Sequence, residues 1–142
     1  MKRIFVLFLF FVGLNIPIFS NSYFDGEGTK DSPFLIKNAN NLRELSLLVR
    51  SGISFKGLYL ELADSIDMTN IFFEPIGLDQ LYPFSGTFDG KGHTISNLNS
   101  TETAAKADGY ICTGLFGAIY DSAVIKNFTI ENVTINTGDY TG

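Results

Sequence analysis

The feature of this sequence that most constrains its fold is a segment that recurs after 28 to 30 residues. The segment SGTFDGKGHTISNLN (85–99) aligns with TGLFGAIYDSAVIKNFT (113–129). The aligned positions share glycine, apolar residues and asparagine: Gly86 with Gly114, Phe88 with Phe116, Ile95 with Ile125, Asn97 with Asn127, and Leu98 with Phe128. A repeat of about 20–50 residues with strand-forming content is typical of a solenoid or a similar array.

The repeat predicts a mainly β fold in which short strands wind into stacked coils. Alternate apolar residues would point into one narrow core, and successive coils would pair at the strand spacing of ~4.8 Å. The expected inward positions are Phe88, Ile95, Phe116, Ile119, Ile125 and Ile130. Asn97 and Asn127 fall at bends, where asparagine tolerates left-handed angles and can form ladders of side-chain amides. The repeat units are therefore about 84–99 and 113–129, with a third unit that begins at GDYTG and is truncated at Gly142.

One helix is predicted ahead of the repeats, over about 41–51. In NNLRELSLLVRSG the leucines and valine lie on one helical face: Leu42, Leu45, Leu48 and Val49. Asn41 and Glu44 have the spacing of a capping box, and Gly52 is a stop signal. We expect this helix to help close the N-terminal end of the coil stack. After it, LYLELADSIDM alternates with a period of two, as a half-buried strand does.

The first 22 residues have the pattern of a secretory signal peptide. Lys2 and Arg3 precede an apolar run from Ile4 to Leu14, and small polar residues follow. The run is shorter than the roughly 20 residues that a membrane-spanning helix needs. Residues 23–142 then carry 8 basic and 15 acidic residues, a net charge of −7. Such a chain repels nucleic acid and anionic membrane surfaces, so we expect a secreted or surface-exposed domain that binds neither.

The sequence offers few residues for metal or nucleophilic chemistry. It has one histidine, His93, and one cysteine, Cys112, so neither a pair of histidines nor a pair of thiols is available for a metal. The alignment puts Ala123 opposite His93, which favours a structural role for the histidine. Cys112 lies among apolar neighbours in YICTGLF and is interpreted as a small buried hydrophobe. We expect no metal, no cofactor and no catalytic residue.

The chain resembles the bacterial GLUG-motif surface proteins. The motif region is TGLFG followed by SAVIKNFTIENVTI, with Gly114, Leu115, Phe116 and Gly117 at its centre. The lead-in segments FDGEGTKDSPFLIKNANNLREL, LELADSIDM, FEPIG and FSGTFDGKGHTISNL occur in the order found in this family. The resemblance implies a right-handed parallel β-helix that is exported or displayed on the cell surface in an adhesive or scaffolding role.

GLUG repeats also occur in the non-catalytic part of some zinc proteases that cleave immunoglobulin, so the alternative is that this chain is the non-catalytic N-terminal region of a larger surface protease. This chain is short for the family, with about two full units, and we expect an N-terminal fragment or a chain that pairs its open edge with another chain. The partners implied are host or cell-surface proteins or glycans.

Three further interpretations stay open. A carbohydrate-active β-helix enzyme would need carboxylates that converge from neighbouring coils. The candidates for it are Asp64, Asp67, Asp79 and Asp89. The five-residue beat in IKNFTIENVTIN resembles pentapeptide-repeat coils, although one coil of the larger repeat explains it better. The sequons at Asn99, Asn127 and Asn132 would matter only in a eukaryotic secretory pathway.

Overall fold

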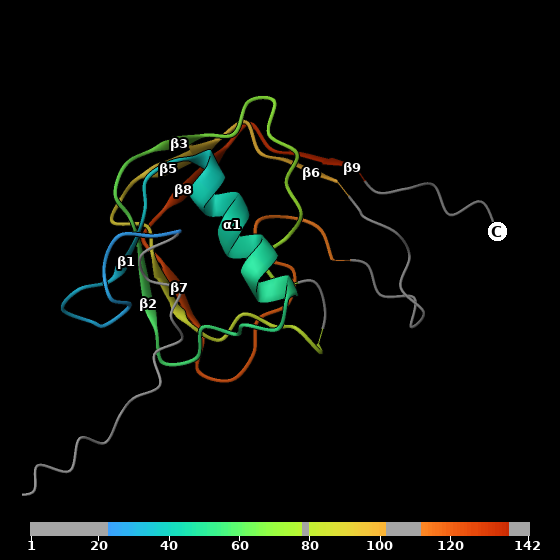
Figure 1. Cartoon of the computed structure of the whole chain (residues 1–142). Helices are drawn as coiled ribbons and strands as arrows, with labels where there is room; N and C mark the ends of the chain where they lie inside the picture. The colour runs from blue at the N-terminus through green and yellow to red at the C-terminus, as the bar shows by residue number, and fades with distance from the viewer. Residues whose placement is uncertain (1–22, 78–79, 102–111, 137–142) are drawn as a thin grey trace, which may run out of the picture.

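The computed structural model describes residues 23–77, 80–101 and 112–136. This part of the chain is mainly β, with one helix and parallel sheets (Figure 1). The predicted signal peptide (1–22), the start of the third unit (137–142) and Asp79 lie outside the described residues. The elements are β1 (Phe34–Ile36), α1 (Ala39–Arg50), β2 (Tyr59–Leu62), β3 (Ile66–Asp67), β4 (Thr87–Asp89), β5 (Thr94–Ser96), β6 (Asn99–Thr101), β7 (Val124–Lys126), β8 (Thr129–Glu131) and β9 (Thr134–Asn136).

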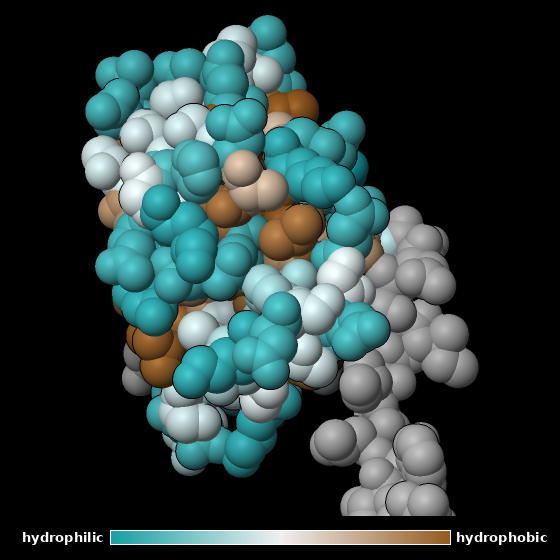
Figure 2. Space-filling view, turned by 90° about the vertical axis from the view of Figure 1, so that its left-hand side faces the viewer, coloured by the Kyte–Doolittle hydropathy of each residue, from teal (hydrophilic) through white to brown (hydrophobic). Residues whose placement is uncertain are grey.

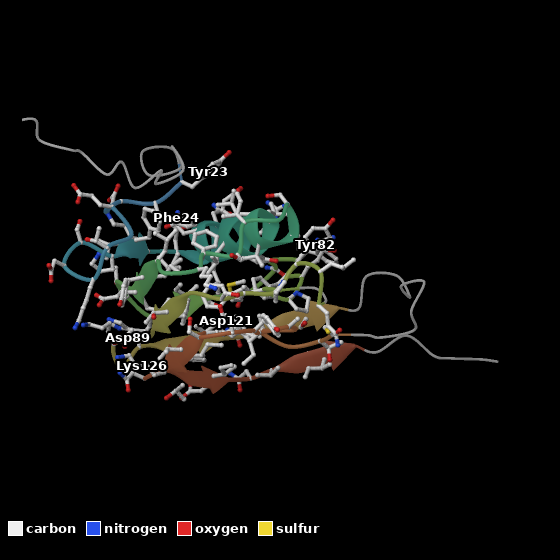
Figure 3. The ribbon with its side chains drawn as sticks, turned by 90° about the horizontal axis from the view of Figure 1, so that it is seen from below. Tyr23, Phe24, Tyr82, Asp89, Asp121 and Lys126 are labelled. Atoms are coloured by element: carbon white, nitrogen blue, oxygen red, sulfur yellow. The ribbon has the colours of Figure 1, made fainter. Side chains whose placement is uncertain are left out.

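The strands form three sheets, and each pass of the chain adds a strand to the sheets in turn. Sheet A has the order β1-β2-β4-β7, sheet B the order β3-β5-β8, and sheet C pairs β6 with β9. All of these pairs are parallel. We call one such pass a layer: β1 belongs to the first, β2 and β3 to the second, β4 to β6 to the third, and β7 to β9 to the fourth. Figure 3 shows the layers stacked in chain order from the N-terminal end.

The register between layers differs from the alignment made on sequence. Phe88 pairs with Ile125, 37 positions later, and not with Phe116, which pairs with Ile76. Ile95 pairs with Ile130, at an offset of 35. The predicted equivalence of the repeats is therefore wrong, although the existence of successive strand layers is not. The layers contain different numbers of residues, so no single offset aligns them all. Phe34 and its partner in β2, for example, are only 26 positions apart.

The core lies between the three sheets and is made of inward side chains stacked in register. Leu60 of β2 and Phe88 of β4 are fully buried neighbours in sheet A, and Ile95 of β5 is fully buried in sheet B. Phe88 and Phe116 do touch, with ring centroids 5.4 Å apart, but as neighbours in the core rather than as equivalent positions. The other expected inward residues are less covered: Ile125 is half-buried, and Ile119 and Ile130 are exposed.

The helix begins earlier than predicted and ends where predicted. Its N-cap is Asn38, whose side-chain oxygen accepts a hydrogen bond from the backbone N–H of Asn41 at 3.0 Å. The capping role assigned to Asn41 is therefore wrong. At the other end, the Ile53 N–H donates to the Leu48 carbonyl and the Gly52 N–H to the Val49 carbonyl. These two bonds, with a φ of +103° at Gly52, form a Schellman C-cap.

Helix α1 lies over the N-terminal end of the space enclosed by the sheets (Figures 1 and 3). Its apolar face is buried, as predicted: Leu42, Leu45, Leu48 and Val49. The buried Ser46 hydroxyl donates to the Glu74 carbonyl at 2.6 Å, and Arg50 forms an ion pair with the Glu74 side chain. The helix is thus attached both to the core and to the segment that precedes β4.

Candidate binding face on sheet A

The outward face of sheet A carries rows of polar side chains in register. Tyr59 of β2 lies beside Thr87 of β4, and Glu61 lies beside Asp89, which in turn lies beside Lys126 of β7. These residues point outward because side chains alternate along a strand and the residues between them, such as Leu60 and Phe88, point inward. Figure 2 shows this side of the molecule, which is hydrophilic over most of its area.

The rows line a pocket that crosses three layers. Its volume is about 290 Å³, just below the range for small-molecule sites, which is about 300–1,000 Å³. The lining residues are Lys30, Tyr59, Leu60, Glu61, Thr87, Asp89, Lys91 and Lys126. In Figure 3, Asp89 and Lys126 lie on the same side of the stack, in adjacent layers.

Lys30 reaches this face from a tight loop that precedes β1. The Glu27 and Thr29 N–H groups both donate to the Ser32 carbonyl, which closes the loop. Gly28 fixes the loop to sheet A, because its carbonyl accepts a hydrogen bond from the Tyr59 N–H at 2.9 Å. A side chain at Gly28 would collide with the ring of Phe34, so the loop can approach β2 only with glycine there.

Lys91 reaches the pocket from the turn between β4 and β5. Its φ is +53°, a left-handed conformation that lysine rarely adopts. The turn is held by Asp89, whose Oδ1 accepts a hydrogen bond from the Lys91 N–H at 3.0 Å. The preceding Gly90 packs directly on the fourth layer, because a Cβ there would lie 2.3 Å from the Cβ of Phe128. The backbone therefore determines where the Lys91 side chain leaves the turn.

The charges of the pocket are largely paired. Lys91 Nζ lies 3.3 Å from Glu61 Oε1, and Lys126 Nζ lies 3.3 Å from Asp89 Oδ2. Burial would raise the pKa of Asp89, but hydrogen bonds from the Lys91 N–H, the Asn127 amide and Lys126 outweigh it and lower the pKa below its ordinary value. Asp89 is therefore a fixed negative charge at neutral pH and is poorly suited to donate a proton.

Two short ladders of polar side chains run along the corners of the stack. In one, the Asn97 amide donates to Asp67 Oδ1 at 2.9 Å, and the Asn132 amide donates to Asn97 Oδ1 at 3.3 Å. In the other, the Asn127 amide donates to Asp89 Oδ1 at 3.1 Å. The partner of Asn97 in the next layer is thus Asn132, and the predicted pairing with Asn127 is wrong. The three asparagines have positive φ: 56° at Asn97, 60° at Asn127 and 52° at Asn132.

The candidate acids do not share one site among the described residues. Asp67 belongs to sheet B and Asp89 to sheet A. The pKa of Asp67 is lowered by hydrogen bonds from the Asn97 amide and then from Thr69. Asp64 is exposed and its Oδ1 accepts from the Ser65 N–H. Within 23–77, 80–101 and 112–136, no group of three or more histidine, cysteine, aspartate or glutamate side chains is placed to hold a metal ion.

The residues singled out for the GLUG resemblance take part in packing between layers. Leu115 is buried, and Phe116 pairs with Ile76 of the preceding layer. Gly114 exchanges two hydrogen bonds with the buried Ser100 hydroxyl, at 2.9 and 3.0 Å. A Cβ at Gly117 would lie 2.4 Å from the Gly77 carbonyl oxygen, so only glycine fits.

The lone histidine and the lone cysteine lie apart from this pocket lining. His93 is half-buried in the turn before β5, where its N–H donates to the Gly90 carbonyl at 2.8 Å. Cys112 is a free thiol of intermediate exposure. Neither residue lines the pocket on sheet A.

Four residues of the pocket were not predicted from the sequence to belong to a site: Lys30, Tyr59, Glu61 and Lys91. The alternation of strand 58–62 did indicate that Tyr59 and Glu61 point outward. The alternation does not give the register between layers. The offset of 30 taken from the sequence alignment does not bring Lys126 beside Asp89. The correct signal was the five-residue beat of 125–136, whose two-residue corners mark the strands of the fourth layer.

The chain matches no protein-family model. It is similar to halomucin of Haloquadratum walsbyi, with 31% identity over 123 residues, which is 84% of this chain and 1% of halomucin. It is also similar to a protein described as a Gly-rich membrane protein in Evansella cellulosilytica, with 32% identity over 127 residues, which is 85% of this chain and 13% of that protein. The chain thus spans a small part of the length of these relatives. Within the part of the chain that the structure describes, no helix has the length and apolar character needed to cross a membrane.

A solved structure shares the fold. It is that of a protein described as an immunoglobulin A1 protease from Bacteroides ovatus, with a TM-score of 0.59 and 24% sequence identity. The match covers 77% of this chain and 29% of that one.

Proposed function

We propose that this chain is part of a right-handed parallel β-helix of the GLUG type, exported and displayed at the cell surface, where it binds other surface molecules without catalysis. The observation that carries the proposal is the outward face of sheet A. There the stacking of three layers brings polar residues from distant parts of the sequence into rows around a pocket. A stacked sheet of this kind offers an extended surface whose outward side chains can vary without change to the core.

Surface display is supported by the start of the sequence, by its relatives and by its charge. The first 22 residues have the pattern of an export signal. The relatives include a halomucin and a protein described as a Gly-rich membrane protein. The excess of acidic residues in 23–142 favours solubility and disfavours contact with an anionic membrane surface.

A binding role is favoured over catalysis by the state of the acids in the pocket. Asp89 accepts hydrogen bonds from Lys91 and Asn127 and pairs with Lys126, while Glu61 pairs with Lys91. A glycosidase needs one carboxyl group that is protonated near neutral pH and one that is ionised. The lowered pKa of Asp89 works against the first requirement.

A second candidate is a non-catalytic region of a larger surface protease. The observation in its favour is the fold shared with the Bacteroides ovatus protein, of which the match covers 29%. Both candidates place the chain outside the cell and assign it contacts rather than chemistry.

The proposal can be tested with the full chain carrying a C-terminal epitope tag in a bacterial host. We expect external protease to remove the tag from intact cells, and deletion of residues 2–14 to leave the tag inside and protected. A tag that is protected in the unaltered chain would contradict surface display. Cleavage of polysaccharides by the purified chain, measured as new reducing ends, would contradict a non-catalytic role.

A further inference from the structure

The pocket on sheet A combines charges of both signs with an aromatic ring, and its balance is positive. It contains three lysines and two carboxylates. Lys91 and Lys126 each pair with one carboxylate, whereas Lys30 forms no ion pair with any described residue. The pocket therefore has one uncompensated positive charge, although residues 23–142 carry a net charge of −7. This local excess of positive charge favours a ligand that places one negative charge in the pocket.

We propose that this pocket binds the carboxylate of an acidic sugar within a polysaccharide, which deepens and rests on the binding role proposed above. Lys30 supplies the free ammonium group for the carboxylate. The side chains of Lys91 and Lys126 are 49% exposed, whereas those of their partners Glu61 and Asp89 are 26% and 13% exposed. Because both lysine side chains are half exposed, their ammonium groups can turn toward a bound carboxylate.

The rest of the pocket matches a sugar ring. Tyr59 offers an aromatic surface to the apolar face of the ring, and Tyr is common at sites that are apolar at one end and wet at the other. The side-chain oxygens of Asp89 and Glu61 can accept hydrogen bonds from sugar hydroxyl groups, and the Thr87 hydroxyl can both donate and accept. Adjacent strands lie ~4.8 Å apart, so a polymer that crosses them along the stack can meet both the row of Tyr59 and Thr87 and the row of Glu61, Asp89 and Lys126.

Charge argues against a densely charged polymer such as nucleic acid. A phosphate backbone would bring many negative charges over a chain whose remaining surface is acidic, and the two carboxylates of the pocket would add to the repulsion. A polysaccharide in which only some of the sugars carry a carboxylate meets the single positive site with one of them and leaves the hydroxyl groups of the others for the acids. Stronger binding of polyphosphate or single-stranded DNA than of acidic polysaccharides would overturn the proposal.

The test compares matched charge removals in the full chain. Lys30→Gln removes the free pocket ammonium, and Lys56→Gln removes an exposed lysine outside the pocket that pairs with Asp121. The probes are immobilised polygalacturonate, alginate and hyaluronate, with methyl-esterified polygalacturonate as the neutral control. We expect the unaltered chain to bind at least one acidic polymer and to bind the ester far more weakly. Lys30→Gln should lose about tenfold in affinity, and Lys56→Gln should lose none.

Three results would overturn the assignment: no binding to any of the three acidic polymers, equal binding to the methyl ester, or equal losses for the two variants. Circular dichroism and thermal unfolding of each variant separate loss of the site from loss of the fold. Surface display, measured with the epitope tag, is independent of these substitutions. A chain that is displayed but fails to bind contradicts the saccharide site alone, whereas a chain that is not displayed contradicts the proposed function.

Discussion

The first and last layers of this stack are built from similar strands but differ in what covers them. At the N-terminal end, helix α1 and Phe24 lie over the core, and the inward residues of β1 are at most 1% exposed. At the C-terminal end, no described residue covers the fourth layer, and Ile130 and Ile135 are 37% and 50% exposed. The comparison shows that the strand pattern determines which way a side chain points, while the neighbouring layer determines whether it is buried.

The largest difference between a covered and an uncovered layer is expected for one pair of stacked residues in sheet B. Ile95 and Ile130 are in register in adjacent layers, and Ile95 is 0% exposed. We expect Ile95→Ala to lower the free energy of unfolding by about 2–5 kcal/mol, because it leaves a cavity in the core. Ile130→Ala should cost about 1 kcal/mol, because that site is already partly solvated. Chemical denaturation of both variants measures the difference, and equal losses would mean that a further layer covers Ile130.

A second test concerns the contact between the third and fourth layers. Gly90→Ala would place a Cβ 2.6 Å from the Asn127 carbonyl oxygen as well as against Phe128. We expect a loss of about 1–3 kcal/mol from this overpacking. Gly92→Ala is the matched control, since it has no atom within 4 Å of the added Cβ and meets only the cost of its positive φ. If Gly92→Ala were the more damaging variant, the close layer contact would not be the cause.

The cover at the N-terminal end can be weakened without touching the core. Asn38→Ala removes the N-cap acceptor of α1 and should cost about 1 kcal/mol. Asn40→Ala is the control, because Asn40 is an exposed position in the first turn. Thermal unfolding followed by circular dichroism provides the readout. A larger loss for Asn40→Ala would assign the cap to a different asparagine.

The smallest expected effect is a dependence of stability on pH at the ladder of Asp89. Its pKa is lower in the folded chain, so its contribution is fully present above its unfolded pKa of about 3.9 and is lost as pH falls through the lower folded value. Urea midpoints measured from neutral pH to pH 2 should fall less steeply for Asp89→Asn than for the unaltered chain. If the midpoints of Asp89→Asn fell as steeply as those of the unaltered chain, Asp89 would not be the source of the pH dependence.

Much of the fold could be predicted from local patterns. The period of two around Leu60 indicated a strand, the spacing of Leu42, Leu45 and Val49 indicated the helix, and Gly52 marked its end. These features depend on neighbours in sequence, which are visible without a structure. The N-cap was missed because three asparagines, Asn38, Asn40 and Asn41, lie close to the start of the helix, and only the backbone geometry selects Asn38.

The candidate site could not be predicted in the same way, because it depends on register. Glu61, Asp89 and Lys126 are separated by 28 and then 37 positions, so no single period brings them together. Lys30 is still harder to foresee, since it comes from a loop that no repeat predicts.

Between the third and fourth layers, a corner differs in length while the strands keep three residues each. Gly90 to His93 separate β4 from β5, whereas only Asn127 and Phe128 separate the corresponding strands β7 and β8. Insertions and deletions can therefore accumulate at these corners during evolution and leave the strand pairing intact. Homologous chains could then drift apart in length and in linear spacing, and they would still present the same rows of side chains to whatever they bind.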